Sequence, residues 1–356
     1  MRLTSLRIHN TRNISDMEIP LQAGFTVFVG PNGAGKTSIL EAAYLLSHAQ
    51  SFRPGPNDVL IRQGADRMVL FGRAETSRGE VQLGLARESG SWLAKVNQEP
   101  VSNLADLLRE FALVCLEPGS HALIAGPGAL RRRFLDWGVF HVEPEHFART
   151  RLYQRLLRQR NALLKQGRDL RQLDAWDEGL AQAGEALGEA REQHFHRYSK
   201  TLAEVLAVFL PELGAPVISL GRGWAELTPL ALALAETRQR DMAKGHTTRG
   251  PHRADWSISF ANAPTREYLS RGQEKLCALA CVLAQAQQYS EQRNEWPVVA
   301  LDDLASELDE QHQQTVIALL SRAGAQVLVS GTELPRSLRD TGANLTVFHV
   351  EHGNLR

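Results

Sequence analysis

The sequence has little of several features that would otherwise narrow its class. It holds 3 cysteines, Cys115, Cys277 and Cys281, which make neither a disulfide framework nor a zinc site. No apolar run approaches the roughly 18 residues that cross a membrane, and the N-terminus lacks the apolar core of a signal peptide. Lys plus Arg equal Asp plus Glu at 40 each, so any nucleic-acid-binding surface must be local. Together these absences predict a cytoplasmic protein with no membrane association.

A glycine-rich loop is the most specific feature that is present. The stretch after the apolar run 25–29 fits the pattern G-x-x-x-x-G-K-[ST] and comprises Gly30, Pro31, Asn32, Gly33, Ala34, Gly35, Lys36, Thr37 and Ser38. The apolar run predicts a buried strand, and the amphipathic run 39–46 predicts a helix. A strand, this loop and a helix in that order predict a site for a nucleoside triphosphate.

The residue types in the loop fit that chemistry. Glycines let the backbone adopt positive φ and let its N–H groups approach phosphate, and a helix N-terminus favours an anion. Lys36 is expected to reach the β- and γ-phosphates, and the Thr37 hydroxyl is placed to bind Mg²⁺. The predicted ligands are therefore ATP and Mg²⁺.

A second motif is the apolar strand 298–301 that ends in Asp302 and Asp303. The carboxyl ends of parallel strands meet at one edge of a sheet, where the phosphate loop also lies. Asp302 is the expected Mg²⁺ partner, bound directly or through water. Asp303 and Lys36 are the expected catalytic residues. Asp303 would orient or deprotonate the attacking water.

The pattern of apolar residues divides the chain. Short strand patterns dominate at both ends, and helical spacing of leucines dominates between them. We predict an α/β fold with a mixed sheet over residues 1–102 and 246–356, and a mainly helical lobe over residues 103–245.

Basic residues gather within the helical lobe. Between Arg131 and Arg171 there are 11 Lys and Arg against 4 Asp and Glu. The candidates for contacting DNA are Arg131, Arg132, Arg151, Arg155 and Arg158, the last three of which form one stripe on a helix. Such a stripe is equally typical of a solvated helix face, or of a surface that neutralises the acidic segment 174–192.

A third motif precedes a predicted helix. Leu269, Ser270, Arg271, Gly272 and Gln273 resemble the signature of ATP-binding-cassette proteins, whose usual core is Leu-Ser-Gly-Gly-Gln. In such proteins the signature serine and helix N-terminus approach the γ-phosphate held by a second copy of the protein. This resemblance implies a head-to-tail homodimer that forms on ATP binding, and residues 306–309 resemble the loop that couples the two sites.

The whole chain resembles the RecF family of bacterial recombination-mediator ATPases, which have an SMC-like head. The stretches that carry the resemblance are 6–13, 30–38, 51–53, 131–137 (Arg-Arg-Arg-Phe-Leu-Asp-Trp), 250–253 (Gly-Pro-His-Arg), 269–273, 301–303 and 306–309. The resemblance implies binding to gapped DNA or junctions of single- and double-stranded DNA. It also implies work with RecO and RecR to place RecA on single strands, and roles in replication restart and the SOS response.

Some positions depart from the cassette pattern. Asp303 stands where cassette ATPases usually carry Glu, and the RecF pattern also has Asp at this position. The shorter side chain of Asp predicts slow hydrolysis, which suits a switch. Thr332 stands near the place of the switch histidine and is a candidate contact to the γ-phosphate. Arg12 lies either near the nucleotide or on the surface.

Two other functions fit parts of the sequence. A transporter ATPase subunit would share the loop and the signature, but Arg271 and the arginine-rich lobe count against it. A small-molecule kinase would share the loop, but it has no use for the signature.

Overall fold

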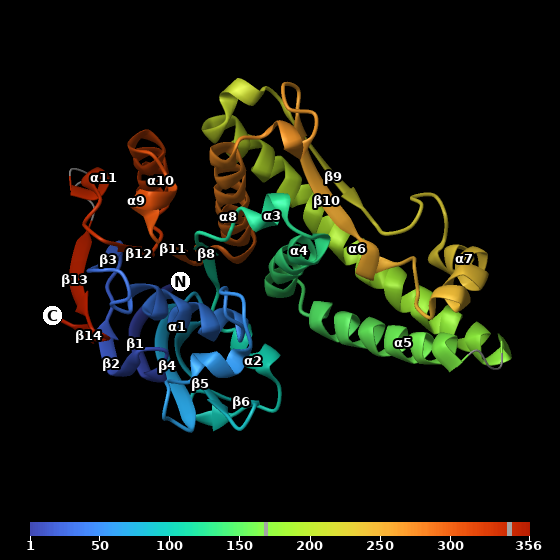
Figure 1. Ribbon diagram of the computed structural model, residues 1–356, viewed down its shortest axis with the longest axis horizontal. Coiled ribbons are helices and arrows are strands. Elements are labelled where there is room, and N and C mark those ends of the chain that lie inside the picture. The colour runs from blue at the N-terminus through green and yellow to red at the C-terminus, as the bar shows by residue number, and fades with distance from the viewer. Residues whose placement is uncertain (167–169, 340–343) are drawn as a thin grey trace. The chain divides into compact units, whose positions relative to one another are not determined.

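The computed structural model describes residues 1–166, 170–339 and 344–356, with the backbone alone at 170–172. The chain forms two compact units (Figure 1). The first comprises Met1–Ser120 and Ala278–Arg356, and the second comprises His121–Cys277. Each unit is described by itself.

An antiparallel sheet forms one layer of the first unit. Its strand order is β2-β1-β4-β5-β6-β7. Buried and exposed side chains alternate along its longer strands, as expected of a sheet with one face on a core. The bounds are β1 Arg2–Thr11, β2 Ile14–Pro20, β4 Arg67–Thr76, β5 Gly79–Glu88, β6 Ser91–Val96 and β7 Glu99–Pro100.

A mixed sheet forms the other layer, with the order β14-β13-β3-β12-β11-β8. The strands from β13 to β8 are parallel, and β14 pairs antiparallel with β13. Every residue of β3, β11 and β12 is buried, as their continuous apolar sequences predict. The bounds are β3 Phe25–Val29, β8 Leu113–Leu116, β11 Val298–Leu301, β12 Val327–Gly331, β13 Leu345–Glu351 and β14 Asn354–Leu355.

Helix α1, Lys36–His48, lies between the two sheets (Figure 1). It contacts β1, β4 and β5 on one side and β8 and β12 on the other. Because both sides are covered, most of its residues are buried. Gln326 also joins the layers, since its side chain exchanges hydrogen bonds of 2.7 and 2.8 Å with the backbone of Leu3.

Shorter elements complete the first unit. They are the 3₁₀ turn η1 Asn57–Leu60, α2 Leu104–Leu108, α9 Leu304–Glu307, α10 Glu310–Arg322 and α11 Arg336–Arg339.

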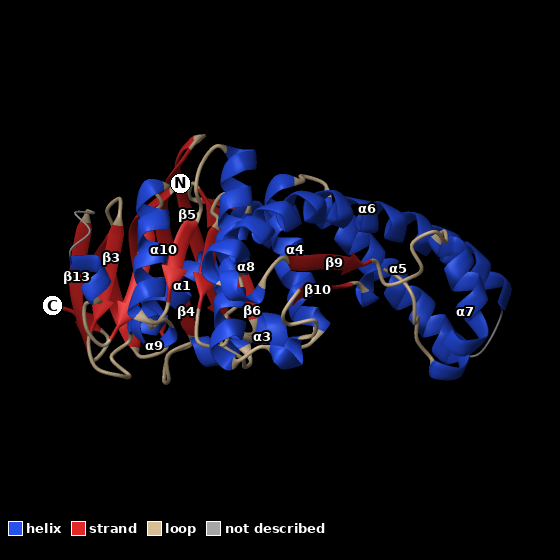
Figure 2. Ribbon diagram, turned by 90° about the horizontal axis from the view of Figure 1, so that it is seen from above, coloured by secondary structure: helices blue, strands red, loops and turns tan. Residues whose placement is uncertain are grey.

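The second unit is mainly helical, as predicted (Figure 2). The long helix α6 contacts α4, α5, α7 and the strand β9, which pairs antiparallel with β10. Apolar side chains of α5, α6 and α7 form its core around Tyr153, Leu187 and Leu234. The bounds are α3 Ala122–Ala125, α4 Gly128–Val142, α5 His146–Gln166, α6 Leu170–Phe209, η2 Pro211–Leu213, β9 Pro216–Gly221, α7 Leu230–Lys244, η3 Pro251–Arg253, β10 Asp255–Phe260 and η4 Arg266–Tyr268.

The two units divide the chain at other places than the predicted boundaries after residues 102 and 245. Strand β8 pairs in parallel with β11, so residues 103–120 belong to the first unit. Strand β10 pairs with β9, so residues 246–277 belong to the second. Helix α8, Arg271–Arg293, runs across the second boundary. Pairing between strands far apart in sequence decided these boundaries. The local sequence pattern does not show which strands pair with each other.

The described helices include none that is long and apolar enough to cross a membrane.

A buried arginine holds the second unit together. Arg160 of α5 is fully buried and donates to Asp177 of α6 at 2.5 Å and to Asp241 of α7 at 2.7 Å. Both carboxylates are buried as well. Charges removed from water need such partners, so this contact ties three helices into one arrangement.

We therefore expect Arg160→Ala to destabilise the second unit by about 3–5 kcal/mol, because the buried Asp241 would lose the arginine that pairs with it and the buried Asp177 would keep only Arg238. Urea unfolding followed by circular dichroism measures this change. Arg155→Ala is the matched control, since Arg155 is exposed on the same helix, and it should change stability by less than about 0.5 kcal/mol. Equal effects of the two substitutions would contradict the role of Arg160.

Candidate functional site

The phosphate loop joins β3 to α1 with the backbone that its glycines predict. Gly33 and Gly35 have φ of 80° and 116°, a region that residues with a Cβ rarely adopt. A Cβ on Gly30 would come within 2.2 Å of the Val350 carbonyl oxygen. Gly35 precedes α1 without a side-chain cap, so the first N–H groups of the helix remain available to an anion.

Lys36 extends back across the loop. Its Nζ donates to the carbonyl oxygens of Gly30 and Pro31, each at 2.8 Å. Burial lowers the pKa of Lys36 from its ordinary value, and the negative charges of Asp303 and Asp302 oppose that shift. The ammonium group is therefore held in the hollow of the loop, beside two carboxylates.

Asp302 lies beside Thr37, as the order of the strands predicts. Its Oδ1 accepts from the Thr37 hydroxyl at 2.9 Å and from the Ser330 hydroxyl at 2.5 Å. Burial raises the pKa of Asp302, while the hydrogen bonds from Ser330 and Thr37 lower it. Strand β12 lies between β3 and β11, so Ser330 at its end joins the two motifs.

Asp303 has a backbone conformation that is uncommon for a residue with a Cβ. Its φ of 55° and ψ of 44° are left-handed, a strain that is most often found at functional sites. Its N–H donates to the Ser330 hydroxyl at 3.0 Å. The turn after β11 is thereby held at the edge of the sheet that carries the phosphate loop.

The oxygens of Thr37 and Asp302 fit a magnesium site. Mg²⁺ takes few protein ligands, usually one or two oxygens, and completes its shell with phosphate oxygens and water. Among the described residues, no group of three or more His, Cys, Asp or Glu side chains could hold a metal by itself. A site that depends on bound phosphate agrees with that observation.

Arg12 belongs to a buried ion pair. Its Nε and one Nη donate to the two carboxylate oxygens of Glu41 at 2.8 and 2.7 Å, and Glu41 is fully buried on α1. The Ser51 hydroxyl also donates to Glu41, and Arg53 lies 3.9 Å from it. Arg12 therefore anchors the helix that carries Lys36, and its guanidinium group is not free at the surface.

Three residues at this edge were missed as site residues. Ser330 bridges the motifs, and Arg53 places positive charge near Asp302, whose pKa it lowers against the effect of burial. Glu117 follows β8, at a position next to Asp302 because the Asp302 N–H donates to the Leu116 carbonyl oxygen at 2.8 Å. Arg53 belongs to 51–53, a stretch that carries the family resemblance. Only their positions at the end of a strand marked Ser330 and Glu117, and that signal is weak without the strand order.

Other residues of the motifs have structural partners. The Ser38 hydroxyl donates to Asn13 at 3.4 Å, and Asp309 caps α10 by accepting from the His312 N–H at 2.9 Å. Thr332 is exposed just beyond β12.

The signature residues lie in the second unit, at the start of α8. The Ser270 hydroxyl accepts from the Gln273 N–H at 3.3 Å, and Gln273 Oε1 accepts from the Ser270 N–H at 3.0 Å. This reciprocal pair is a capping box. Ser270, Arg271 and Gly272 are exposed, so the Ser270 hydroxyl can still donate a hydrogen bond to a group outside the chain.

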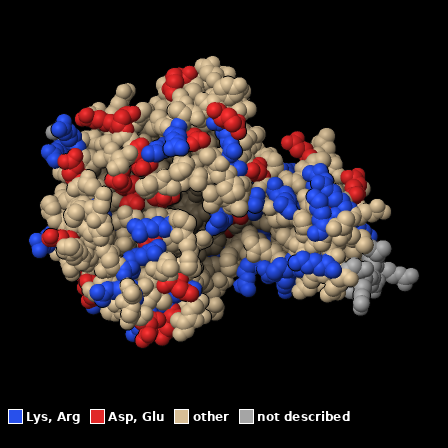
Figure 3. All heavy atoms as spheres, viewed as in Figure 1, with Lys and Arg blue, Asp and Glu red and all other residues tan. Residues whose placement is uncertain are grey.

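The predicted DNA-contacting arginines fall into two groups. Arg131 donates to both carboxylate oxygens of Asp255 at 2.7 and 2.9 Å, and Arg132 donates to the Ala254 carbonyl oxygen at 2.8 Å. These two arginines hold α4 to β10. By contrast, the stripe of Arg151, Arg155 and Arg158 is exposed on α5. Figure 3 shows Lys and Arg gathered over the helical unit; the side chains of Arg168 and Arg171 lie outside the described residues.

The comparisons with solved structures support the fold. A structure of the recombination mediator protein RecF with ATP, in the RecFOR pathway, aligns with a TM-score of 0.90 at 24% identity, over 99% of this chain and 96% of that one. An SMC head bound to the C-terminal winged-helix domain of ScpA aligns with a TM-score of 0.60 at 16% identity, over 100% and 96%. The predicted SMC-type head with a helical lobe is confirmed.

The comparisons of sequence identify the family. Residues 2–355 match the RecF/RecN/SMC N-terminal domain family. The DNA replication and repair protein RecF of Stenotrophomonas maltophilia is 46% identical, over 100% of this chain and 99% of that protein. The protein of the same name from Aliivibrio fischeri is 36% identical, over 100% and 99%. This chain therefore belongs to the RecF family, within the wider RecF/RecN/SMC group.

Proposed function

We propose that this protein is an ATP-dependent DNA-binding protein of recombinational repair. The observation that carries the proposal is the meeting of the phosphate loop with Asp302 and Asp303 at one sheet edge, in a chain 46% identical to a RecF protein along its length. Its relatives are named DNA replication and repair proteins, which favours this function over that of a transporter subunit or a kinase.

The residues of the loop perform the binding step. Lys36 would exchange its two carbonyl partners for phosphate oxygens, and the backbone N–H groups at the start of α1 would donate to the same anion. Thr37 and Asp302 would hold Mg²⁺, which when bound neutralises charge on the phosphates. Both side chains already share a hydrogen bond, so little rearrangement is needed.

Asp303 supplies the hydrolytic step in this proposal. Its carboxylate orients or deprotonates the water that attacks the γ-phosphate. An aspartate side chain reaches less far than a glutamate side chain would, so ATP hydrolysis is slow and weak. We propose in addition that DNA stimulates this hydrolysis. Slow turnover suits a switch that holds a bound state and then releases it.

A second copy of the chain completes the site. Ser270 and the N-terminus of α8 are exposed and able to donate to phosphate. In the proposed head-to-tail homodimer, they meet the ATP held by the partner copy. ATP then closes the dimer, the closed dimer binds gapped DNA or a junction of single- and double-stranded DNA, and hydrolysis opens it.

The proposed partners follow from the family. The similar solved structure is described as part of the RecFOR pathway, which supports work with RecO and RecR. We place this work in the cytoplasm. We propose that the three proteins promote RecA loading, replication restart and SOS induction.

The first prediction concerns Lys36→Met. We expect the variant to lose ATP binding, with affinity reduced by roughly 100-fold or more, because charged hydrogen bonds to phosphate are lost. Isothermal titration calorimetry with ATP and Mg²⁺ measures the change. Lys95→Met is the matched control on an exposed strand position, and unchanged affinity in Lys36→Met would reject Lys36 as the phosphate ligand.

The second prediction concerns Asp303→Asn. The amide cannot take a proton from water, so we expect ATP to bind while phosphate release falls by roughly 100-fold. Light scattering with ATP should then show more dimer than for the unmodified protein. Asp66→Asn, at an exposed position, should behave like the unmodified protein, and normal turnover in Asp303→Asn would remove Asp303 from the mechanism.

The third experiment tests the switch as a whole. Fluorescence anisotropy measures binding of a labelled gapped duplex with ATP, with ADP and without nucleotide. We expect tight binding with ATP alone, and we expect Ser270→Arg to lose it while keeping ATP affinity, because the larger side chain blocks the dimer. Ser91→Arg, exposed at the start of β6, is the control.

The outcomes separate the alternatives. Equal binding in all three nucleotide states would mean that ATP does not control DNA binding. Normal ATP-dependent dimerisation of Ser270→Arg would exclude the signature from the neighbouring site.

A further inference from the structure

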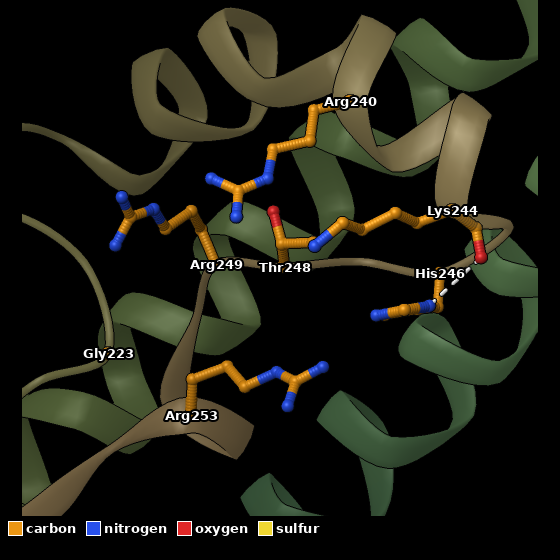
Figure 4. A pocket seen from close by; sticks show the side chains of 7 residues that line it. All are labelled: Gly223, Arg240, Lys244, His246, Thr248, Arg249 and Arg253. Atoms are coloured by element: carbon orange, nitrogen blue, oxygen red, sulfur yellow. Dashed lines mark hydrogen bonds between the residues drawn. The ribbon is translucent and has the colours of Figure 1, made fainter.

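The second unit contains a cationic cavity that the proposed ATP cycle does not use. Its volume is about 330 Å³, and it lies between the end of α7 and the turn before β10 (Figure 4). Arg240 and Lys244 reach in from α7, and Arg253 reaches in from the opposite side. The lining residues are Gly223, Arg240, Lys244, His246, Thr248, Arg249 and Arg253, among which there is no carboxylate.

The cations of this cavity differ from five buried or half-buried arginines of the same unit. Arg131, Arg160, Arg191, Arg222 and Arg238 each form an ion pair with an Asp or Glu. Within the described part of the chain, no ion pair engages Arg240, Lys244, Arg249 or Arg253, and all four are exposed. Four like charges that line one cavity repel one another, and a bound anion would reduce that repulsion.

A network of buried hydrogen bonds holds the loop that carries these residues. Thr248 donates to the buried Asp241 through its N–H at 3.0 Å and its hydroxyl at 2.6 Å. Thr247 donates to Asn161 in the same two ways, at 2.8 and 2.7 Å. The buried Arg160 joins the two threonines, because it donates both to Asp241 and to the Thr247 hydroxyl.

The histidine of the Gly-Pro-His-Arg motif belongs to the same network. His252 Nε2 lies 3.0 Å from the Thr247 carbonyl oxygen, and its Nδ1 lies 2.7 Å from the Tyr153 hydroxyl. Burial lowers the pKa of His252 to about 4, and the positive charges of Arg253 and Arg132 act in the same direction. His252 is therefore neutral at pH 7 and serves to hold the loop, while Arg253 next to it points into the cavity.

Two glycines permit this shape. A Cβ on Gly223 would lie 2.2 Å from the Gly250 carbonyl oxygen, and a Cβ on Gly250 would lie 2.5 Å from the Tyr153 hydroxyl. Both also have positive φ, of 97° and 130°. Gly223 is thus required for the close approach of two backbone segments, and the glycine of the motif is required for the approach to Tyr153.

We propose that this cavity is a binding site for clustered phosphates. Three arginines offer planar guanidinium groups that match phosphate oxygens, and a lysine adds a further positive charge. The phosphates belong either to a nucleic-acid backbone or to a free polyphosphate. For the first source the inference rests on the proposed function, and the cavity contacts the phosphate backbone, which carries no sequence information directly.

The test compares two double variants that remove the same charges from the same unit. Arg240→Ala/Lys244→Ala empties one wall of the cavity, and Arg197→Ala/Lys200→Ala is the control, with both residues exposed on α6. Alanine favours helix, so both proteins should fold, which circular dichroism and ATP affinity verify. Anisotropy with a labelled gapped duplex and ATP measures DNA binding across a series of salt concentrations, and calorimetry with tripolyphosphate measures binding of the free anion.

Counterion release sets the expected size of the effect. Loss of two phosphate contacts should weaken DNA binding by roughly 30-fold at about 0.15 M salt and lower the slope of log affinity against log salt by about 1.8. The control should keep the affinity and slope of the unmodified protein. Loss of tripolyphosphate binding with unchanged DNA binding would assign the cavity to a free polyphosphate.

The remaining outcomes separate this inference from the proposed function. If the unmodified protein binds DNA and the cavity variant matches the control with both ligands, the inference is overturned and the proposed function stands. If the unmodified protein binds no DNA but the cavity variant alone loses tripolyphosphate, the phosphate site stands and the proposed function fails.

Discussion

The hydrogen bonds of one buried carboxylate hold the nucleotide site together. Asp302 accepts from Thr37 and from Ser330, so the ends of β11 and β12 and the start of α1 are joined at one point. The Ser330 hydroxyl also accepts from the Asp303 N–H, which holds the strained residue that follows. The positions of Lys36, Thr37 and Asp303, to which we assign phosphate binding, metal binding and activation of water in the proposed function, therefore depend on this contact. Parallel strands make it possible, because their carboxyl ends lie at the same edge.

A second buried contact holds the helix that begins at the phosphate loop. Glu41 lies in the helix that begins at Lys36, and it accepts hydrogen bonds from Arg12 and Ser51. Residues from the antiparallel sheet and from the turn after α1 thus hold the same helix. A buried carboxylate with three donors has few alternative arrangements, so the N-terminus of α1 stays aimed at the loop.

The helical unit uses the same principle for a different surface. Arg160 links α5, α6 and α7 and also the loop at Thr247 and Thr248. Its charge is balanced within the unit, whereas the cations around the cavity have no such balance among the described residues. An interior with paired charges thereby presents a positive surface without paired charges, which is the arrangement expected where an anion binds.

By itself, the sequence determined the phosphate loop, the strand before it, the helix after it and the acidic pair after β11, because each depends on residues close together in the chain. It also determined the family, through motifs in a fixed order. Tertiary structure alone decided that β8 belongs to the first unit, that Arg131 and Arg132 are held by Asp255 and Ala254, and that Ser330 joins the two motifs. The cationic cavity was also beyond the sequence: Arg240 and Lys244 stand four residues apart on one helix, but only the fold brings Arg249 and Arg253 to the same cavity. Contacts between distant segments depend on strand order and helix packing, which a local pattern does not encode.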